Sequence, residues 1–157
     1  MKLQFWSVGK DHEPYIKSGV ELFTQRISHY FSVEWKLIPV PRHTGMLSEA
    51  DLKKKESQTL LNLLQPEDYL VALDEQGKSL TSEGLAQFLQ KRSNESVKRL
   101  VFLIGGAYGI DASVRQRAQY VWSLSALTFP HQLVRLILAE QVYRACTILK
   151  NEKYHHR

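Results

Sequence analysis

Five apolar residues run without interruption into a pair of glycines in the sequence Leu100-Val101-Phe102-Leu103-Ile104-Gly105-Gly106. A short, continuous apolar run that ends in turn residues is typical of a strand buried on both faces, as in a parallel sheet. The segment Tyr69-Leu70-Val71-Ala72-Leu73 has the same character, and the residues after it, Asp74-Glu75-Gln76-Gly77-Lys78, predict a turn or loop. Two such strands predict a parallel sheet at the centre of the fold.

The rest of the chain alternates between strand and helix patterns. Three more strands are predicted near residues 3–8, 33–40 and 120–124, and residues 41–45 are predicted to form a loop. The alternation predicts one α/β domain over residues 1–157, a three-layer α/β/α sandwich with a mostly parallel sheet. Helices are predicted to begin at Pro14, after a capping residue at Ser48, at Thr81 or Ser82, and after Pro130. A short helix is predicted after a capping residue at Asp111.

The chain has 157 residues, a formal net charge of +5 and a pI of about 9.3. This moderate positive excess favours an anionic partner such as nucleic acid, although a solvated basic surface without a partner gives the same numbers. The run Lys53-Lys54-Lys55 has the same two interpretations, a solvated helix face or a set of contacts to an RNA backbone.

Cys146 is the single cysteine, so we expect no internal disulfide, no thiolate metal site and a reducing compartment. Gln4, Ser7 and Gly9 interrupt the N-terminal apolar residues too early for a signal peptide, and no window approaches the roughly 20 apolar residues of a membrane span. We therefore expect a cytoplasmic protein that does not enter a membrane. No metalloprotease or paired-carboxylate motif is present, so we expect no metal.

Ligands of open parallel sheets bind beyond the carboxyl ends of the strands, and three loops qualify, after Leu73, Ile104 and Leu124. The loop at residues 105–109 is rich in glycine and allows close approach of backbone to a ligand, unless it is a plain turn. It is not a dinucleotide fingerprint, because Ala107 occupies the second glycine position, and no P-loop lysine follows.

The third loop and the following helix carry unusual residues. Residues 123–131 are apolar and hydroxyl-rich, so they either pack into the core or wrap a flat, partly apolar ligand such as adenine. His131 and Arg135 share a face at the helix start, where a cation opposes the helix dipole; either an anion lies nearby or Arg135 is a surface residue with its stem packed down. Glu140 and Arg144 are spaced to pair across one turn.

Several short motifs occur along this chain in the same order as in a known family. The chain resembles the RlmH family of small SPOUT-class methyltransferases from end to end. The residues that carry the resemblance are Gly9-Lys10, Leu73-Asp74 with Gly77-Lys78, Leu103-Ile104-Gly105-Gly106 with Gly109, Trp122-Ser123-Leu124-Ser125-Ala126-Leu127-Thr128 with Pro130-His131, Leu133-Val134-Arg135, Glu140-Gln141-Val142-Tyr143-Arg144-Ala145, and Tyr154-His155.

The resemblance implies transfer of a methyl group from S-adenosylmethionine to N3 of a pseudouridine in 23S ribosomal RNA, on assembled ribosomes or large subunits. It also implies a homodimer with a C-terminal trefoil knot. Residues implied to face the RNA or the reacting base are His131, Arg135, Tyr154 and His155, with the C-terminal residues completing the partner subunit's site. Residues implied to contact the cofactor are Leu73, Gly105, Leu124, Ser125, Ala126, Leu127, Thr128 and Phe129.

Our hypothesis for the chemistry is that His131 or His155 helps N3 to lose its proton, while Arg135 or Arg157 holds a phosphate or stabilises charge on the base. Two alternatives stay open from the residues alone. An RNA-binding module without catalysis explains the charge, and would be distinguished by a failure to bind S-adenosylmethionine. A small-nucleotide enzyme with a Rossmann-like site would carry a glycine fingerprint after the first strand, which residues 8–12 lack.

Overall fold

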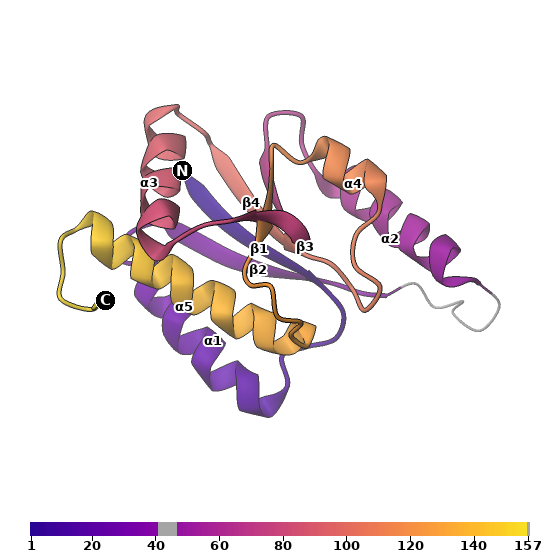
Figure 1. Ribbon diagram of the computed structural model, residues 1–157, viewed down its shortest axis with the longest axis horizontal. Helices are drawn as coiled ribbons and strands as arrows, with labels where there is room; N and C mark the ends of the chain where they lie inside the picture. Colours follow the sequence, from indigo (N-terminus) through magenta and orange to yellow (C-terminus); the bar gives the residue numbers. More distant parts are fainter. Residues whose placement is uncertain (41–46, 157) are drawn as a thin grey trace.

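The computed structural model describes residues 1–40 and 47–156, so the loop predicted at residues 41–45 lies outside the described residues. Strands and helices alternate along this part of the chain, as the sequence predicts (Figure 1). The elements are β1 (Lys2–Val8), α1 (Pro14–Ile27), β2 (Ser32–Ile38), α2 (Glu49–Leu63), β3 (Tyr69–Ser79), α3 (Ser82–Asn94), β4 (Arg99–Ile104), α4 (Ala112–Arg117), β5 (Tyr120–Ser123) and α5 (His131–Leu149).

The strands form one sheet in the order β2-β1-β4-β3-β5, and every pairing between described neighbours is parallel. The predicted parallel sheet is therefore confirmed, with β4 in its middle. Because β4 has a neighbour on each side and helices above and below, all its residues from Leu100 to Ile104 are buried. This explains why its sequence is a continuous apolar run.

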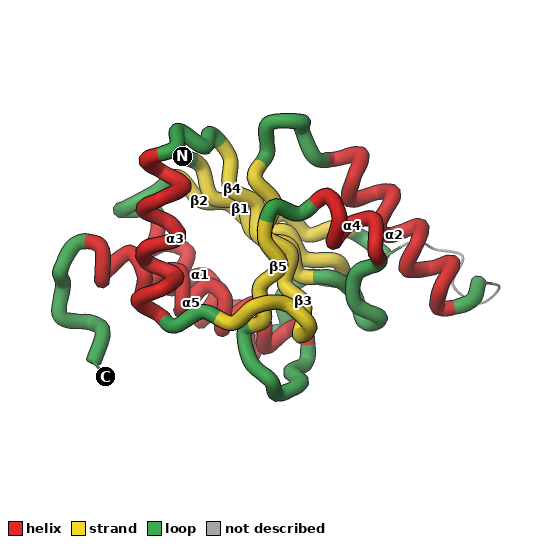
Figure 2. The backbone as a smooth tube through the Cα atoms, turned by 45° about the horizontal axis from the view of Figure 1, so that its top comes forward, coloured by secondary structure: helices red, strands yellow, loops and turns green. Residues whose placement is uncertain are grey.

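Helices cover both faces of the sheet, so the predicted α/β/α architecture is confirmed (Figures 1 and 2). Helices α1, α3 and α5 pack on one face, where β4 contributes Leu100, Phe102 and Ile104. Helices α2 and α4 lie on the other face, where β4 contributes Val101 and Leu103. This alternation is the two-residue period of a strand. The trefoil knot that the family resemblance implies stays a prediction.

The prediction of a turn or loop at Asp74-Glu75-Gln76-Gly77-Lys78 is wrong, because β3 continues through these residues to Ser79. Its first half pairs with β5 up to Leu73, opposite Trp122, and its second half pairs again after a shift of register, with Lys78 opposite Trp122. A Cβ at Gly77 would lie only 2.5 Å from the carbonyl oxygen of Val121. Gly77 is therefore required by the close approach of two strands and does not mark a turn.

Side chains at the predicted positions cap three helices. Ser48 accepts a hydrogen bond from the backbone N–H of Asp51 at 3.2 Å, which starts α2. Thr81 accepts from Gly84 at 2.9 Å at the start of α3, and Asp111 accepts from Ser113 and Val114 at the start of α4. These contacts satisfy backbone donors that a helix leaves unpaired in its first turn.

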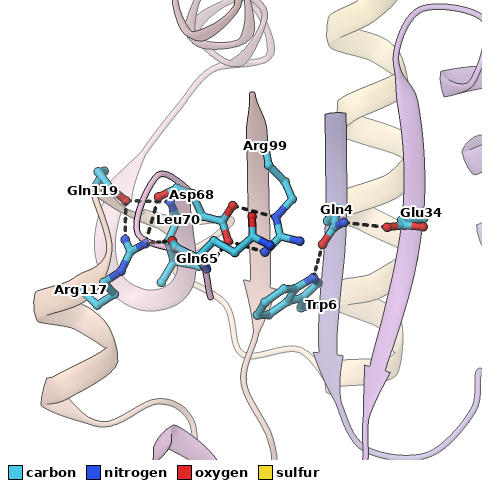
Figure 3. A network of polar contacts seen from close by, with 9 residues as sticks. All are labelled: Gln4, Trp6, Glu34, Gln65, Asp68, Leu70, Arg99, Arg117 and Gln119. Atoms are coloured by element: carbon cyan, nitrogen blue, oxygen red, sulfur yellow. Dashed lines mark hydrogen bonds and ion pairs between the residues drawn. The ribbon is translucent and has the colours of Figure 1, made fainter. Parts of the chain in front are cut away.

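A polar network holds the amino-terminal ends of the central strands together (Figure 3). The carboxylate of Asp68, just before β3, accepts two hydrogen bonds from the guanidinium of Arg99 at the start of β4. Asp68 also accepts from the backbone N–H of Gln65 at 2.8 Å, and its side chain is fully buried. This network lies at the opposite edge of the sheet from the carboxyl-terminal ends of these strands, where parallel sheets bind ligands.

In the described parts of the chain, no helix is both long enough and apolar enough to cross a membrane.

Candidate functional site

A cavity of about 440 Å³ lies at the carboxyl-terminal ends of β3, β4 and β5. Leu73, Ile104 and Leu124, after which the sequence predicts ligand-binding loops, all line this cavity, although the residues that follow Leu73 are strand and not loop. The volume lies within the range of small-molecule sites, roughly 300–1,000 Å³. Seven of the eight residues expected to contact a cofactor line it, namely Leu73, Gly105, Leu124, Ser125, Leu127, Thr128 and Phe129.

Leu124 at the start of the loop after β5 packs against the core, but the middle of the loop is exposed. Leu127 is 69% exposed although its side chain is apolar, and its neighbours Ala126 and Thr128 are also exposed. Ala126, the eighth expected contact, does not border the cavity. The loop is fixed locally, because Ser125 Oγ accepts from the N–H of Leu127 at 3.0 Å and Ser123 Oγ donates to the carbonyl of Ser125 at 3.1 Å. Of the two interpretations from the sequence, exposure favours the wrapping of a ligand.

The glycine loop after β4 forms the second wall. It closes on itself through a hydrogen bond from the N–H of Gly109 to the carbonyl of Gly106 at 3.0 Å. A Cβ at Gly105 would lie 2.8 Å from Ile110, and a Cβ at Gly106 would lie 2.3 Å from a carboxylate oxygen of Glu56. A side chain at Gly105 would meet Ile110 and the backbone of Gly109, and one at Gly106 would require the Glu56 carboxylate to shift, so the loop presents its backbone to the cavity.

Glu56 supports this loop from α2 and is only 8% exposed. Burial raises the pKa of its carboxyl group above the ordinary value. Glu56 could not be predicted from the sequence, because its position beneath Gly106 depends on how α2 packs on the sheet. Its one signal is its place directly after the lysine run, which by itself predicts only a solvated face.

Charged side chains also line the cavity. Asp74 Oδ2 and Arg115 Nη1 form an ion pair at 3.1 Å, and Arg115 Nη1 donates to the carbonyl of Ile110 at 3.0 Å. Lys53 lines the cavity as well, whereas Lys54 and Lys55 are exposed on α2. The lysine run stands out in the sequence, but the Asp74–Arg115 pair was not predicted; the signal for Asp74 was its position directly after a buried apolar run.

The two basic residues predicted at the start of α5 occupy different environments. His131 borders the cavity, whereas Arg135 does not and is 0% exposed. The interpretation of Arg135 as a surface residue is therefore wrong, because its guanidinium lies inside the protein against the turn that follows β1. Burial lowers the pKa of His131, and the positive charge of Arg135 lowers it further.

Tyr154 and His155 do not border the cavity of their own chain. Tyr154 donates to Glu140 Oε1 at 3.2 Å, and His155 Nε2 lies 3.1 Å from Glu83 Oε1. His155 Nδ1 faces Arg144 Nη1 at 3.2 Å, and because arginine only donates, this nitrogen accepts and Nε2 carries the proton. The predicted pairing of Glu140 with Arg144 is confirmed, with Arg144 Nη2 lying 2.6 Å from Glu140 Oε1. Arg157 lies outside the described residues.

The C-terminal tail, the residues that follow α5 and include Tyr154 and His155, therefore lies near the end of α5 that is remote from the cavity (Figure 1). Glu140 is nine residues after His131, which at about 1.5 Å of rise per residue places it roughly 13 Å further along the helix. Four residues predicted to act together thus fall into two groups in the described chain. His131 and Arg135 lie at the start of α5, and Tyr154 and His155 lie by its second half.

The chain is an α/β protein with a cavity at the carboxyl ends of a parallel sheet. The family model described as "Predicted SPOUT methyltransferase" matches residues 1–155. A protein of Cytophaga hutchinsonii named "Ribosomal RNA large subunit methyltransferase H" is 46% identical over 156 residues, covering 99% of this chain and all of the relative. A protein of the same name from Christiangramia forsetii is 43% identical over the full length of both chains.

The fold agrees with these matches. A crystal structure of a probable methyltransferase from Bordetella pertussis Tohama I superimposes with a TM-score of 0.60, covering 92% of this chain and 96% of that one at 13% identity. This chain belongs to the SPOUT methyltransferase family, together with the ribosomal RNA large subunit methyltransferase H proteins that match its whole length.

Proposed function

We propose that this protein transfers a methyl group from S-adenosylmethionine to N3 of a pseudouridine in 23S ribosomal RNA, acting in the cytoplasm on the assembled ribosome or large subunit. The observation that carries the proposal is the cavity at the ends of β3, β4 and β5, whose walls contain seven of the residues expected to hold the methyl donor. The name of the relatives supports ribosomal RNA as the substrate.

The residues around the cavity fit the chemistry of S-adenosylmethionine. Leu73, Leu124 and Phe129 provide apolar surface for a flat adenine ring. The glycine loop offers backbone groups at close range, since side chains at Gly105 and Gly106 would meet their neighbours. S-adenosylmethionine supplies an activated methyl group, because its sulfonium is a good leaving group.

The chain itself must bind and orient the reactants and help N3 lose its proton. His131 borders the cavity, and a neutral imidazole there can accept the N3 proton and pass it to water. Arg135 contributes positive potential to this side of the site and no direct phosphate contact, because its guanidinium is buried. Lys53 is placed at the cavity for an RNA phosphate, and the net charge of +5 favours RNA generally.

A homodimer accounts for the position of the tail. Tyr154 and His155 lie by the second half of α5, away from the cavity of their own chain. An aromatic ring and an imidazole suit base stacking and proton transfer, so we propose that they complete the cavity of a partner subunit. His155 is then the second candidate for the group that accepts the N3 proton.

The proposal is tested first by blocking the cavity. Ser125→Trp places a bulky ring in the wall, and we expect its affinity for S-adenosylmethionine in calorimetry to fall more than tenfold, or about 1.4 kcal/mol. Gln116→Trp adds the same ring on exposed α4, outside the cavity lining, and should bind like the wild type. Equal affinities of the two variants would place the donor elsewhere.

The roles of the histidines are tested by methyl transfer to ribosomes. We expect His131→Ala and His155→Ala to bind the donor, and at least one of them to lose about 10²-fold or more in turnover. Unchanged turnover in both variants would remove a histidine from the proton transfer.

A further inference from the structure

Arg135 carries a buried positive charge that no carboxylate neutralises in the described parts of the chain. Its Nε donates to Ser7 Oγ at 2.8 Å, and its Nη1 donates to the carbonyl of Lys10 at 2.9 Å and lies 3.2 Å from His12 Nδ1. All three partners are neutral acceptors, since a guanidinium only donates and His12 must therefore offer an unprotonated Nδ1. Nη2 is buried without a hydrogen-bond partner among the described residues.

Burying an unpaired charge costs free energy, because the charge loses its hydration, and buried charges in proteins are therefore almost always paired. Burial lowers the pKa of Arg135, while Asp11 and Glu13 act in the opposite direction through space. A guanidinium nevertheless stays charged in proteins. The positive potential of Arg135 therefore acts on whatever lies beside it.

His131 lies beside it. A Cβ built on Gly9 would be 3.4 Å from Arg135 Nη2 and 3.6 Å from His131 Nε2, so the two nitrogens face the same point of the turn after β1. Gly9 has a φ of +133°, which disfavours any residue with a side chain. The turn after β1 thus brings the cation and the imidazole of the cavity wall together.

Three influences disfavour a proton on His131. Burial is the largest, the charge of Arg135 is the second, and the amino-terminal end of α5 adds the positive end of the helix dipole. Glu13 opposes them from the N-cap of α1, and Asp11 and His12 lie in the same turn. The other charged or titratable side chains around the cavity are Lys53 on α2, Asp74 and Glu75 on β3, Tyr108 in the glycine loop and Arg115 on α4.

We propose that Arg135 is a positioning residue of the methyltransferase site, and that its buried charge keeps His131 in the neutral form at the cavity wall. Only the catalytic consequence rests on the proposed function. A neutral imidazole can accept the N3 proton, whereas an imidazolium cannot.

The test is an NMR titration of the His131 ring in the full-length protein without substrate. The signal that disappears in His131→Gln identifies the His131 ring among the six histidines of the chain. In the wild type we expect the midpoint of His131 to lie below the ordinary value of about 6.5. In Arg135→Gln we expect it to rise, and in Arg135→Lys, which keeps a positive charge, to stay below that of Arg135→Gln.

Lys91→Gln is the matched control, because it removes an exposed positive charge from α3 and should leave the midpoint unchanged. A wild-type midpoint at or above 6.5 overturns the proposal, and this outcome can be read even if Arg135→Gln does not fold. A low wild-type midpoint that does not move in Arg135→Gln also overturns it, since burial alone would then keep the ring neutral.

The same variants separate this inference from the proposed function. If the midpoint of His131 rises in Arg135→Gln but the wild type transfers no methyl group to ribosomes, the electrostatic role stands and the substrate is wrong. If transfer occurs, the acidic limb of its pH profile should move to higher pH in Arg135→Gln, a change that a merely structural role of Arg135 would not produce.

Discussion

Replacing Ser7 by alanine tests the environment of Arg135 through stability. Ser7 Oγ is the acceptor for Arg135 Nε at 2.8 Å, and both residues are 0% exposed. Water therefore cannot replace the hydroxyl in the variant. Since Nη2 already has no partner among the described residues, Ser7→Ala leaves a second guanidinium nitrogen unsatisfied.

The expected loss follows from this geometry. A hydrogen bond to a charged group contributes about 1.5–3 kcal/mol, and the buried donor left behind keeps its desolvation cost. We expect the free energy of unfolding to fall by about 2 kcal/mol. For a chain of this size that corresponds to a decrease in Tm of about 4–8 °C.

Urea denaturation measures the change directly, with an unchanged m-value as the sign that only stability has been altered. Ser28→Ala is the control, because Ser28 is exposed at the end of α1 and should cost less than about 0.5 kcal/mol. A loss for Ser7→Ala no larger than that of the control would refute the view that Ser7 holds a buried charge.

Of four further predictions, one concerns the site, one the strand ends and two the thiol. Gly105→Ala should weaken donor binding more than tenfold in calorimetry, about 1.4 kcal/mol, because its Cβ would lie 2.8 Å from Ile110 and 3.1 Å from the backbone of Gly109 in the cavity wall; wild-type affinity would contradict this. Asp68→Ala should cost about 3 kcal/mol in urea denaturation, since Arg99 loses a fully buried partner, and a cost below about 0.5 kcal/mol would show the pair to be unimportant. Burial raises the pKa of Cys146 from 9.0 to about 12, so the native thiol should resist alkylation at pH 8, where rapid modification would contradict burial. The unfolded chain then holds fewer protons than the native one between pH 9 and about 12, and we expect Cys146 to make unfolding easier as pH rises through this range, relative to Cys146→Ala.

The position of the cavity could be predicted from the sequence, because it follows from a local pattern. The apolar runs that end at Leu73 and Ile104 mark buried parallel strands, and such strands gather their following loops at one edge. The cap residues were equally predictable, since Ser48 and Asp111 act on backbone groups within three residues.

Features that depend on distant neighbours could not be predicted in this way. The polar residues after Leu73 read as a loop, yet they form strand because β5 pairs with them a second time after a shift of register. The sequence left two alternatives for Arg135, a residue facing an anion or an exposed residue. Helical spacing places it on the same face as His131 but does not show how deeply the turn after β1 covers it. The residues of the C-terminal tail suggest a chemistry, but their spacing alone does not show that Tyr154 contacts Glu140 and His155 contacts Glu83 in their own chain.

The most direct test of the proposed function is transfer of tritium from labelled S-adenosylmethionine, with wild-type protein, purified ribosomes and protein-free large-subunit RNA, followed by mass spectrometry of the labelled nucleoside. We predict label on N3 of a single pseudouridine in 23S ribosomal RNA, with the assembled particle as the better substrate. Absence of label from both substrates, or label on a different base, would contradict the proposed function even if the donor binds in the cavity.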